Sequence, residues 1–184
     1  EAIFRLDKRG TGEVLVEGRR LPRGRVRTAL ARGVGLVPED RKRQGLVLMM
    51  GGRQNISLPL LDRLSTFGFL RHSKERRITT DYFARLRVKT ASIAAPVSSM
   101  SGGNQQKVVI AKWLARGGRV LIVDEPTRGV DIGAKAAIHH LLDELAQSGV
   151  AVIVISSDLP EVLAISSRVL VMREGRIVGE LSRA

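Results

Sequence analysis

The sequence predicts an α/β fold, mainly a parallel sheet, with a helical insertion and a C-terminal β-hairpin. Two predicted strands, residues 119–123 and 150–155, contain apolar runs with the length of buried strands, and residues 133–147 between them have the spacing of a helix. Strand, helix and strand in this order favour parallel pairing through a right-handed crossover. Near the end of the chain, residues 168–172 and 176–181 flank a glycine turn, which predicts the hairpin.

Local patterns predict the elements of the first part of the chain. Residues 13–18 alternate in polarity and end on glycine, as an exposed strand entering a turn does. Residues 25–32 have the spacing of a short helix, which Gly33 stops. Residues 34–37 form an apolar run that Pro38 ends, so we expect a buried strand there.

The middle of the chain predicts the helical insertion. Residues 39–71 are irregular and rich in Gly and Arg, whereas residues 73–87 and 104–115 have helical spacing. Two apolar stripes identify the faces on which helices pack. The stripes are Ile78, Tyr82 and Leu86 in one helix, and Ile138, Leu141, Leu142 and Leu145 in the helix at 133–147.

Composition narrows the class of protein. The chain has 184 residues, 43% of them hydrophobic, so it can bury a core and is not a disordered tail. It has no cysteine, which rules out disulfides and thiolate metal sites, and no apolar run near the roughly 18–20 residues of a membrane helix. The net charge of +13 is compatible with nucleic acid, anionic lipid or phosphorylated ligands as partners, and with a plain basic surface. We favour the plain basic surface over a nucleic-acid groove, and only 3% of the residues are aromatic, which is few for stacking on bases.

Two carboxylates follow the apolar run at 120–123. Asp124 and Glu125 would lie at the C-terminal end of a parallel strand, where α/β sheets hold their ligands. A carboxylate there can hold Mg²⁺, which prefers oxygen ligands, and its neighbour can orient or deprotonate a water that attacks a γ-phosphate. The alternative is a strand that ends in a solvated acidic turn, and this motif alone does not decide between the two.

A glycine turn precedes the helix at 104–115. Ser101, Gly102 and Gly103 let a phosphate approach the backbone, and the N–H groups of the first helical turn point at it. The alternative is an ordinary helix with a serine N-cap. The glycine turn and the acidic pair stand in this order, about twenty residues apart, and together they are far more specific than either one.

These motifs resemble those of ATP-binding-cassette (ABC) ATPases. Residues 100–107, Met-Ser-Gly-Gly-Asn-Gln-Gln-Lys, are similar to the family's signature motif, usually Leu-Ser-Gly-Gly-Gln. Asp124 and Glu125 resemble its Walker B aspartate and catalytic glutamate, and residues 127–131 resemble its D-loop, which crosses the dimer interface.

One subgroup is closer still. Residues 38–43, 101–107 and 155–163 are similar to the second cassette of the ATPase subunits of ribose-, galactose- and xylose-type importers, and the resemblance spans residues 1–184. The resemblance implies one partial ABC nucleotide-binding domain with a P-loop NTPase-like fold. In that domain, residues 1–50 and 116–184 would form the core sheet and its flanking helices, and residues from about 51 to 115 a helical subdomain that carries the signature motif.

The resemblance also implies a role for each matched residue. Glu125 would be catalytic, Asp124 would hold Mg²⁺, and Asp131 would belong to the D-loop. The positions that would bind the ATP of another cassette, in trans, are Ser101, Gly102, Gly103 and Asn104.

The chain departs from the family at three places. It contains no G-x-x-x-x-G-K-[ST] phosphate loop (Walker A), which the family places shortly upstream of residue 1, and we interpret the start as truncated. Glu39 stands at the position of the Q-loop glutamine, and Ser157 at that of the switch histidine. A carboxylate cannot donate a hydrogen bond and serine has no titratable ring, so we expect this half's own nucleotide site to be slow or regulatory.

The implied function is ATP hydrolysis coupled to monosaccharide import, with ATP and Mg²⁺ as cofactors; the chain alone is expected to be inactive. The implied partners are another ABC cassette, transmembrane permease subunits and, indirectly, a sugar-binding protein, at the cytoplasmic face of the cell membrane. Direct binding of nucleic acid is not expected. The alternatives are a soluble ABC ATPase acting on nucleic acid or ribosomes, and a non-catalytic remnant domain.

Three weaker features have two interpretations each. His139 and His140 are neighbours on a predicted helix and point about 100° apart, so we expect plain surface residues and not metal ligands. Residues 41–43 are a solvated charge run or part of a permease-binding surface. Apolar residues at 49–50 and 58–61 belong either to the core or to a docking groove for the permease.

Overall fold

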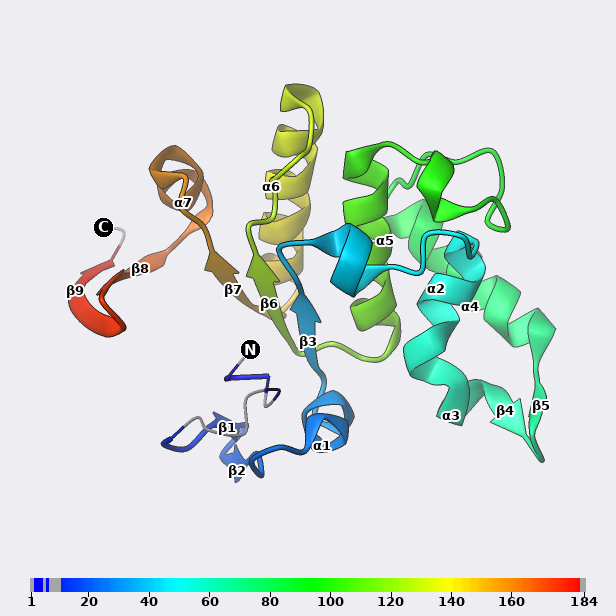
Figure 1. The fold of residues 1–184 in the computed structure, drawn as a ribbon, viewed down its shortest axis with the longest axis horizontal. Coiled ribbons are helices and arrows are strands. Elements are labelled where there is room, and N and C mark those ends of the chain that lie inside the picture. The colour runs from blue at the N-terminus through cyan, green and yellow to red at the C-terminus, as the bar shows by residue number, and fades with distance from the viewer. Residues whose placement is uncertain (1, 5, 7–10, 183–184) are drawn as a thin grey trace.

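The computed structural model describes residues 2–4, 6 and 11–182 and is built on a parallel sheet of three strands (Figure 1). Strands β3 (Val34–Val37), β6 (Val120–Asp124) and β7 (Ala151–Ile155) lie in the order β3-β6-β7. Both pairings are parallel and in register along the strands. The predicted parallel sheet is confirmed, and the C-terminal ends of its strands meet at one edge.

Alternation along the strands divides the apolar core into two layers. Leu121 and Val123 pack with helices α5 (Gly102–Ala115) and α6 (Ile132–Gln147), whose predicted stripe from Ile138 to Leu145 is buried. Ile122, between them, faces the opposite layer, since successive side chains of a strand point to opposite faces. That layer is formed by the N-terminal segment, helix α1 (Val26–Ala31) and the hairpin of β1 (Leu15–Val16) and β2 (Arg19–Arg20).

The segment between β3 and β6 is more helical than the sequence predicts. Residues 39–71 are expected from the sequence to be irregular, but they contain regular elements because their apolar side chains pack on α5 and on helix α4 (His72–Arg85). The elements are a π-helical turn (Arg41–Gly45), α2 (Gly52–Ser57), a 3-10 turn (Leu58–Leu60), α3 (Leu61–Leu64), β4 (Ser65–Thr66) and β5 (Phe69–Leu70).

Helix α4 (His72–Arg85) packs through a different face from the predicted stripe. Ile78 and Tyr82 are only partly buried, whereas Glu75, Thr79 and Phe83 are buried. The Ser57 hydroxyl donates a hydrogen bond to the Glu75 Oε1 at 2.7 Å. This polar contact with α2 helps to set which face of α4 is buried. Leu86, the third residue of the predicted stripe, is buried as expected.

The C-terminal segment consists of helix α7 (Leu159–Ile165) and the predicted hairpin of β8 (Arg168–Arg173) and β9 (Arg176–Ser182). Strand β7, predicted as buried, is covered on one face only. Ile153 is 38% exposed and Ile155 is 45% exposed, because the layer that covers Ile122 does not reach across β7.

Within residues 2–4, 6 and 11–182, no helix combines the length and apolar character needed to span a membrane.

Candidate functional site

The glycine turn (residues 101–103) lies at the N-terminus of α5, at the same end of the molecule as the C-terminal ends of the strands (Figure 1). Ser101 is the N-cap. Its Oγ accepts hydrogen bonds from the Asn104 backbone N–H at 3.4 Å and from the Asn104 Nδ2 at 2.8 Å. The Asn104 Oδ1 in turn accepts the Lys89 N–H at 2.7 Å. Because the first N–H groups of a helix have no acceptor within it, the turn presents amide donors to an anion.

Close packing explains both glycines of the turn. A Cβ at Gly102 would lie 2.7 Å from the Arg41 Nη2 and 2.7 Å from the Gly129 carbonyl oxygen. A Cβ at Gly103 would lie 2.7 Å from the Cβ of Ala134, in the first turn of α6. The structure therefore holds the glycine turn directly against the D-loop segment (residues 127–131).

The D-loop segment also connects to two further predicted positions. Asp131 is the N-cap of α6, and its Oδ1 accepts the Ala134 N–H at 2.9 Å. Glu39, at the predicted Q-loop position, forms an ion pair with Arg128. Both of these side chains are exposed, so the pair alone contributes little to stability.

Asp124 ends β6, and Glu125 follows it in a strained backbone conformation. Glu125 has a φ of 46°, which side chains with a Cβ avoid, and it precedes Pro126, which normally confines its neighbour to extended φ and ψ. The Ser157 N–H donates to the Glu125 Oε1 at 2.9 Å and holds the carboxylate beside the end of β7. Strain of this kind costs about 1–3 kcal/mol and is typical of functional sites.

A buried carboxylate, Glu161, binds side chains close to the C-terminal ends of β6 and β7. Glu161 is 4% exposed and accepts three hydrogen bonds, from the Thr127 Oγ1 at 2.8 Å, the His139 Nε2 at 2.8 Å and the Ser156 Oγ at 2.6 Å. Burial acts to raise the pKa of Glu161, but the hydrogen bonds from Ser156, His139 and Thr127 outweigh it and lower that pKa. Glu161 thus connects Thr127, two residues after Glu125, with Ser156, the residue before Ser157, and with His139 of α6.

The charge beside the glycine turn is positive. The Lys107 Nζ donates to the Arg87 carbonyl oxygen at 3.2 Å, next to Lys89. The pKa of Lys107 is lowered, first by burial and then by the positive charges of Lys89 and Arg87. An anion at this place would relieve the repulsion.

The acidic pair fits Mg²⁺ that shares its ligands with a nucleotide. Within the described part of the chain, no group of three or more His, Asp or Glu side chains could hold a metal ion alone. Mg²⁺ is usually held by one or two carboxylates together with phosphate oxygens and waters, and Asp124 and Glu125 supply that number. Of the two, Glu125 borders a hollow of about 330 Å³ between the D-loop segment and Ser157.

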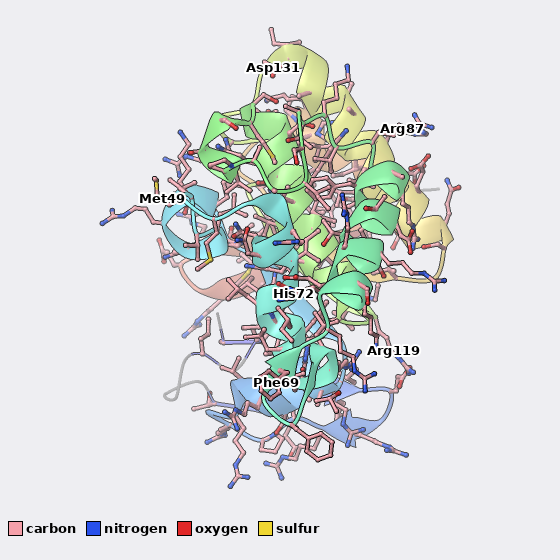
Figure 2. All side chains as sticks on the ribbon, turned by 90° about the vertical axis from the view of Figure 1, so that its right-hand side faces the viewer. Met49, Phe69, His72, Arg87, Arg119 and Asp131 are labelled. Atoms are coloured by element: carbon pink, nitrogen blue, oxygen red, sulfur yellow. The ribbon has the colours of Figure 1, made fainter. Side chains whose placement is uncertain are left out.

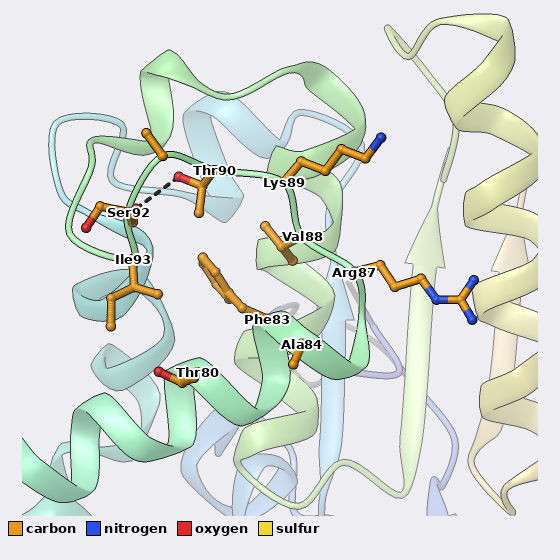
Figure 3. Close-up of a pocket in the computed structure, with 10 residues that line it drawn as sticks. Thr80, Phe83, Ala84, Arg87, Val88, Lys89, Thr90, Ser92 and Ile93 are labelled. Atoms are coloured by element: carbon orange, nitrogen blue, oxygen red, sulfur yellow. Dashed lines mark hydrogen bonds between the residues drawn. The ribbon is translucent and has the colours of Figure 1, made fainter.

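A second hollow, of about 500 Å³, lies on the helical side under residues 87–93 (Figure 3). Phe83, Val88 and Ile93 line it, while the charged ends of Arg87 and Lys89 point away from it. This hollow is apolar and holds none of the predicted site residues, so we assign it no part in the chemistry.

Two residues were misjudged from the sequence. Arg41 was placed in a run with Lys42 and Arg43, but it is 7% exposed, and only its two neighbours are solvated. His139 was expected on the surface, but its side chain is 22% exposed because it bonds to Glu161; His140 is exposed as expected. Spacing gave one signal for Glu161, since an acid three residues after Asp158 is a helix-start pattern.

The apolar residues with two interpretations divide between core and surface. Met49 is 81% exposed and projects from the edge of the molecule (Figure 2), and Met50, Leu58 and Leu61 are each about 40% exposed. Leu60 is 2% exposed and belongs to the core. Most of this set is therefore surface.

Comparison with known proteins shows the class to which this fold and site belong. A family model described as ABC transporter matches residues 1–128, and the chain belongs to that family. The solved dimer of MJ0796, a bacterial ABC transporter cassette, superposes with a TM-score of 0.78 at 23% identity, covering 97% of this chain and 76% of that one. The cbiO1 protein of Clostridium perfringens, part of the ABC transporter complex cbiONQ, superposes with a TM-score of 0.77 at 23% identity, covering 97% of this chain and 68% of that one. The expected ABC cassette fold is confirmed.

The similar curated proteins are more specific. The ribose import ATP-binding protein RbsA 2 of Streptomyces avermitilis is 56% identical over 100% of this chain and 36% of its own length. The ribose import ATP-binding protein RbsA of Rhodococcus jostii is 52% identical over 100% of this chain and 37% of its own length. The chain thus spans little more than a third of the relatives that it matches.

Proposed function

We propose that this chain is the C-terminal cassette of the ATP-binding subunit of a monosaccharide importer, and that it completes the ATP site of another cassette. The observation that carries the proposal is the glycine turn, where a helix start capped by the exposed Ser101 lies beside the positive charges of Lys107, Lys89 and Arg87. Such a surface can bind the phosphate of a nucleotide that is held by another cassette. The names of the relatives favour ribose as the sugar.

In this proposal, the residues of the turn act by binding. Ser101 contributes its hydroxyl, the amides of Gly102 and Gly103 face the terminal phosphate, and Asn104 fixes the Ser101 hydroxyl through their hydrogen bond at 2.8 Å. ATP held between two cassettes ties them together, and its hydrolysis releases them. That change in association is the two-state element that can drive a transporter.

The acidic pair, Asp124 and Glu125 at the C-terminal end of β6, would act on a nucleotide bound to this cassette itself. Asp124 would hold Mg²⁺, which supplies charge neutralisation to the phosphates, and Glu125 would orient the attacking water. The Glu125 carboxylate is held by a backbone N–H of Ser157 and not by an imidazole, which supports a slow or regulatory role for this site.

The phosphate loop would come from the remainder of the longer protein. Among the described strands, β7 pairs only with β6, and its exposed Ile153 and Ile155 offer an apolar edge and face for a further strand. We propose that this strand delivers the loop beside Glu125. The division into a core (1–50 and 116–184) and a helical subdomain (about 51–115) belongs to the same proposal.

The exposed apolar residues around Met49 are proposed as the permease contact. Val47, Met49, Met50, Leu58 and Leu61 are exposed on neighbouring elements of the helical segment, and methionines adapt well to a partner surface. The protein would then lie peripherally on the cytoplasmic face of the membrane, and the sugar-binding protein would act on it through the permease.

The test is ATP hydrolysis by the full-length protein with Ser101→Arg, which fills the space ahead of the helix. We expect Ser101→Arg to abolish turnover, and Glu125→Gln to reduce it less, because Glu125 serves the slower site. Ser98→Arg is the matched control, since Ser98 is exposed three residues upstream. Equal losses from Ser101→Arg and Glu125→Gln would contradict the proposed action in trans.

The alternative of an ATPase acting on nucleic acid rests on net charge alone. Similarity over the whole chain to import proteins favours the importer. Binding of DNA or RNA with a steep salt dependence would reverse this preference.

A further inference from the structure

The buried guanidinium of Arg41 is the least expected group near the site. Arg41 is 7% exposed, and none of the ion pairs between described residues includes it. Its neighbour Asp40 is the N-cap of the π-helical turn, and its Oδ1 accepts the N–H groups of Lys42 and Arg43, each at 3.1 Å. Burial lowers the pKa of Arg41, while the charge of Asp40 opposes the shift. A buried charge without a close counter-ion is costly, so its other contacts matter.

Those contacts go to the D-loop segment, 87 and 88 residues further along the chain. The Arg41 Nη1 donates to the Arg128 carbonyl oxygen at 2.6 Å, and the Nη2 donates to the Gly129 carbonyl oxygen at 2.9 Å. Two donors in a rigid plane fix the positions of two successive peptide carbonyls, which a lysine could not do. The fork therefore determines the path of the backbone just before Asp131.

The same guanidinium also lies against the glycine turn. The Arg41 Nη2 and the Gly129 carbonyl oxygen both come within 2.7 Å of where a Gly102 Cβ would be. Gly102, Arg41 and Gly129 therefore form one packed unit from three separate segments. The Arg128 side chain adds an ion pair to Glu39, two residues before Arg41.

We propose that Arg41 is a positioning residue that fastens the D-loop segment to the glycine turn, so that both reach a neighbouring cassette as a single rigid surface. This role rests on the proposed function, in which the turn closes on the ATP of another cassette. Arg41 itself touches no nucleotide in this proposal. It acts through the carbonyls of Arg128 and Gly129 and through the packing of Gly102.

The test compares Arg41→Gln and Arg41→Lys with Arg43→Gln in the full-length protein. Arg43 is exposed on the same π-helical turn, so it controls for the loss of a positive charge. For Arg41→Gln we expect kcat for ATP to fall at least tenfold with KM within threefold, because the other contacts of the nucleotide remain. Arg41→Lys keeps the charge but not the fork, and we expect a loss of roughly two- to tenfold. Arg43→Gln should stay within twofold.

Hydrogen exchange supplies a readout apart from activity. Amides of residues 128–131 should exchange faster in Arg41→Gln and Arg41→Lys than in the wild type, and at the wild-type rate in Arg43→Gln. Should Arg41→Gln fail to fold, Arg41→Lys decides alone: wild-type kcat and wild-type exchange in that variant would overturn the proposal.

Ser101→Arg in the same assay separates the two proposals. Full activity of Ser101→Arg would refute the trans-acting turn and, with it, the role of Arg41. Loss of activity in Ser101→Arg, together with wild-type kcat in both Arg41 variants, would refute the role of Arg41 alone.

Discussion

Asn55 offers a sharp test of how the surface proposed for the permease is held. Its side chain is fully buried, and its Oδ1 accepts the Val47 N–H at 2.8 Å. Its Nδ2 donates to the carbonyl oxygens of Val47, Met50 and Gly51 at 3.0, 3.2 and 3.1 Å. One amide therefore fastens the loop that carries Met49 onto α2.

The loss of stability expected for Asn55→Ala depends on which polar groups the substitution leaves unpaired. The three carbonyls keep backbone donors, from the Met50 N–H to Val47, the Val97 N–H to Met50 and the residue 55 N–H to Gly51. The Val47 N–H loses its acceptor. An orphaned donor costs about 1–3 kcal/mol, and with the weakened carbonyls we expect a loss of about 2–4 kcal/mol. For a chain of this size that corresponds to a fall in Tm of roughly 5–15 °C.

The assay is hydrogen exchange of residues 46–51 in the full-length protein, with thermal unfolding beside it. We expect Asn55→Ala to speed exchange in this segment far more than Asn104→Ala, whose lost bonds are exposed. Wild-type exchange of the Val47 amide in Asn55→Ala would refute the assignment.

Asn55→Asp sharpens the same test. It keeps an acceptor for the Val47 N–H but turns a carboxylate oxygen towards three carbonyls. Repulsion and burial would raise the pKa of the new carboxyl group, so this variant should be less stable than Asn55→Ala at pH 7 and recover as the pH falls towards 5. A loss that does not change with pH would mean that the carbonyls do not face the side chain as described.

Three further predictions use other parts of the structure. Because Glu125 has a φ of 46°, Glu125→Gly should be more stable than Glu125→Ala by about 1 kcal/mol in thermal unfolding, although both lose the carboxylate; equal stabilities would contradict the strain. Burial lowers the pKa of Lys112 to about 8, below its value in the unfolded chain, so the unfolded state binds more protons between these values and stability gains as the pH rises through that range. Any gain in Tm from Lys112→Met should therefore be largest near pH 7 and shrink by pH 10, whereas a constant difference would contradict the shift. The isolated chain, which contains no phosphate loop, should bind ATP only weakly and not hydrolyse it; micromolar affinity by calorimetry would contradict this.

Elements marked by short-range signals were predicted well. Strand β3 was bounded by Gly33 and Pro38 in the sequence and runs from Val34 to Val37. The hairpin of β8 and β9 turns at Glu174 and Gly175, both with positive φ, as a tight turn requires. Helix α5 starts at Gly102, two residues earlier than predicted, because Ser101 already caps it.

Elements that depend on distant partners were predicted less well. The apolar stripe of α4 was placed on Ile78 and Tyr82, but a hydrogen bond from Ser57 to Glu75 helps to set which face is buried. Strand β7 was apolar enough to be buried, but a sequence does not state how far the covering layer extends, and Ile153 is left exposed. Helix α7 was not predicted, although Asp158 caps it through its Oδ1 and the Glu161 N–H at 3.4 Å.

The sequence by itself determined the strands and helices with local boundaries, the glycine turn, the acidic pair and, through them, the family. These follow from neighbours in the chain, where polarity period, caps and glycines act within a few residues. Only the tertiary structure decided that Arg41 is buried against carbonyls 87 and 88 residues away, and that Glu161 gathers Thr127, His139 and Ser156. The physical reason is that the burial of a charge depends on which polar groups folding brings to it, and residue type alone does not specify those groups.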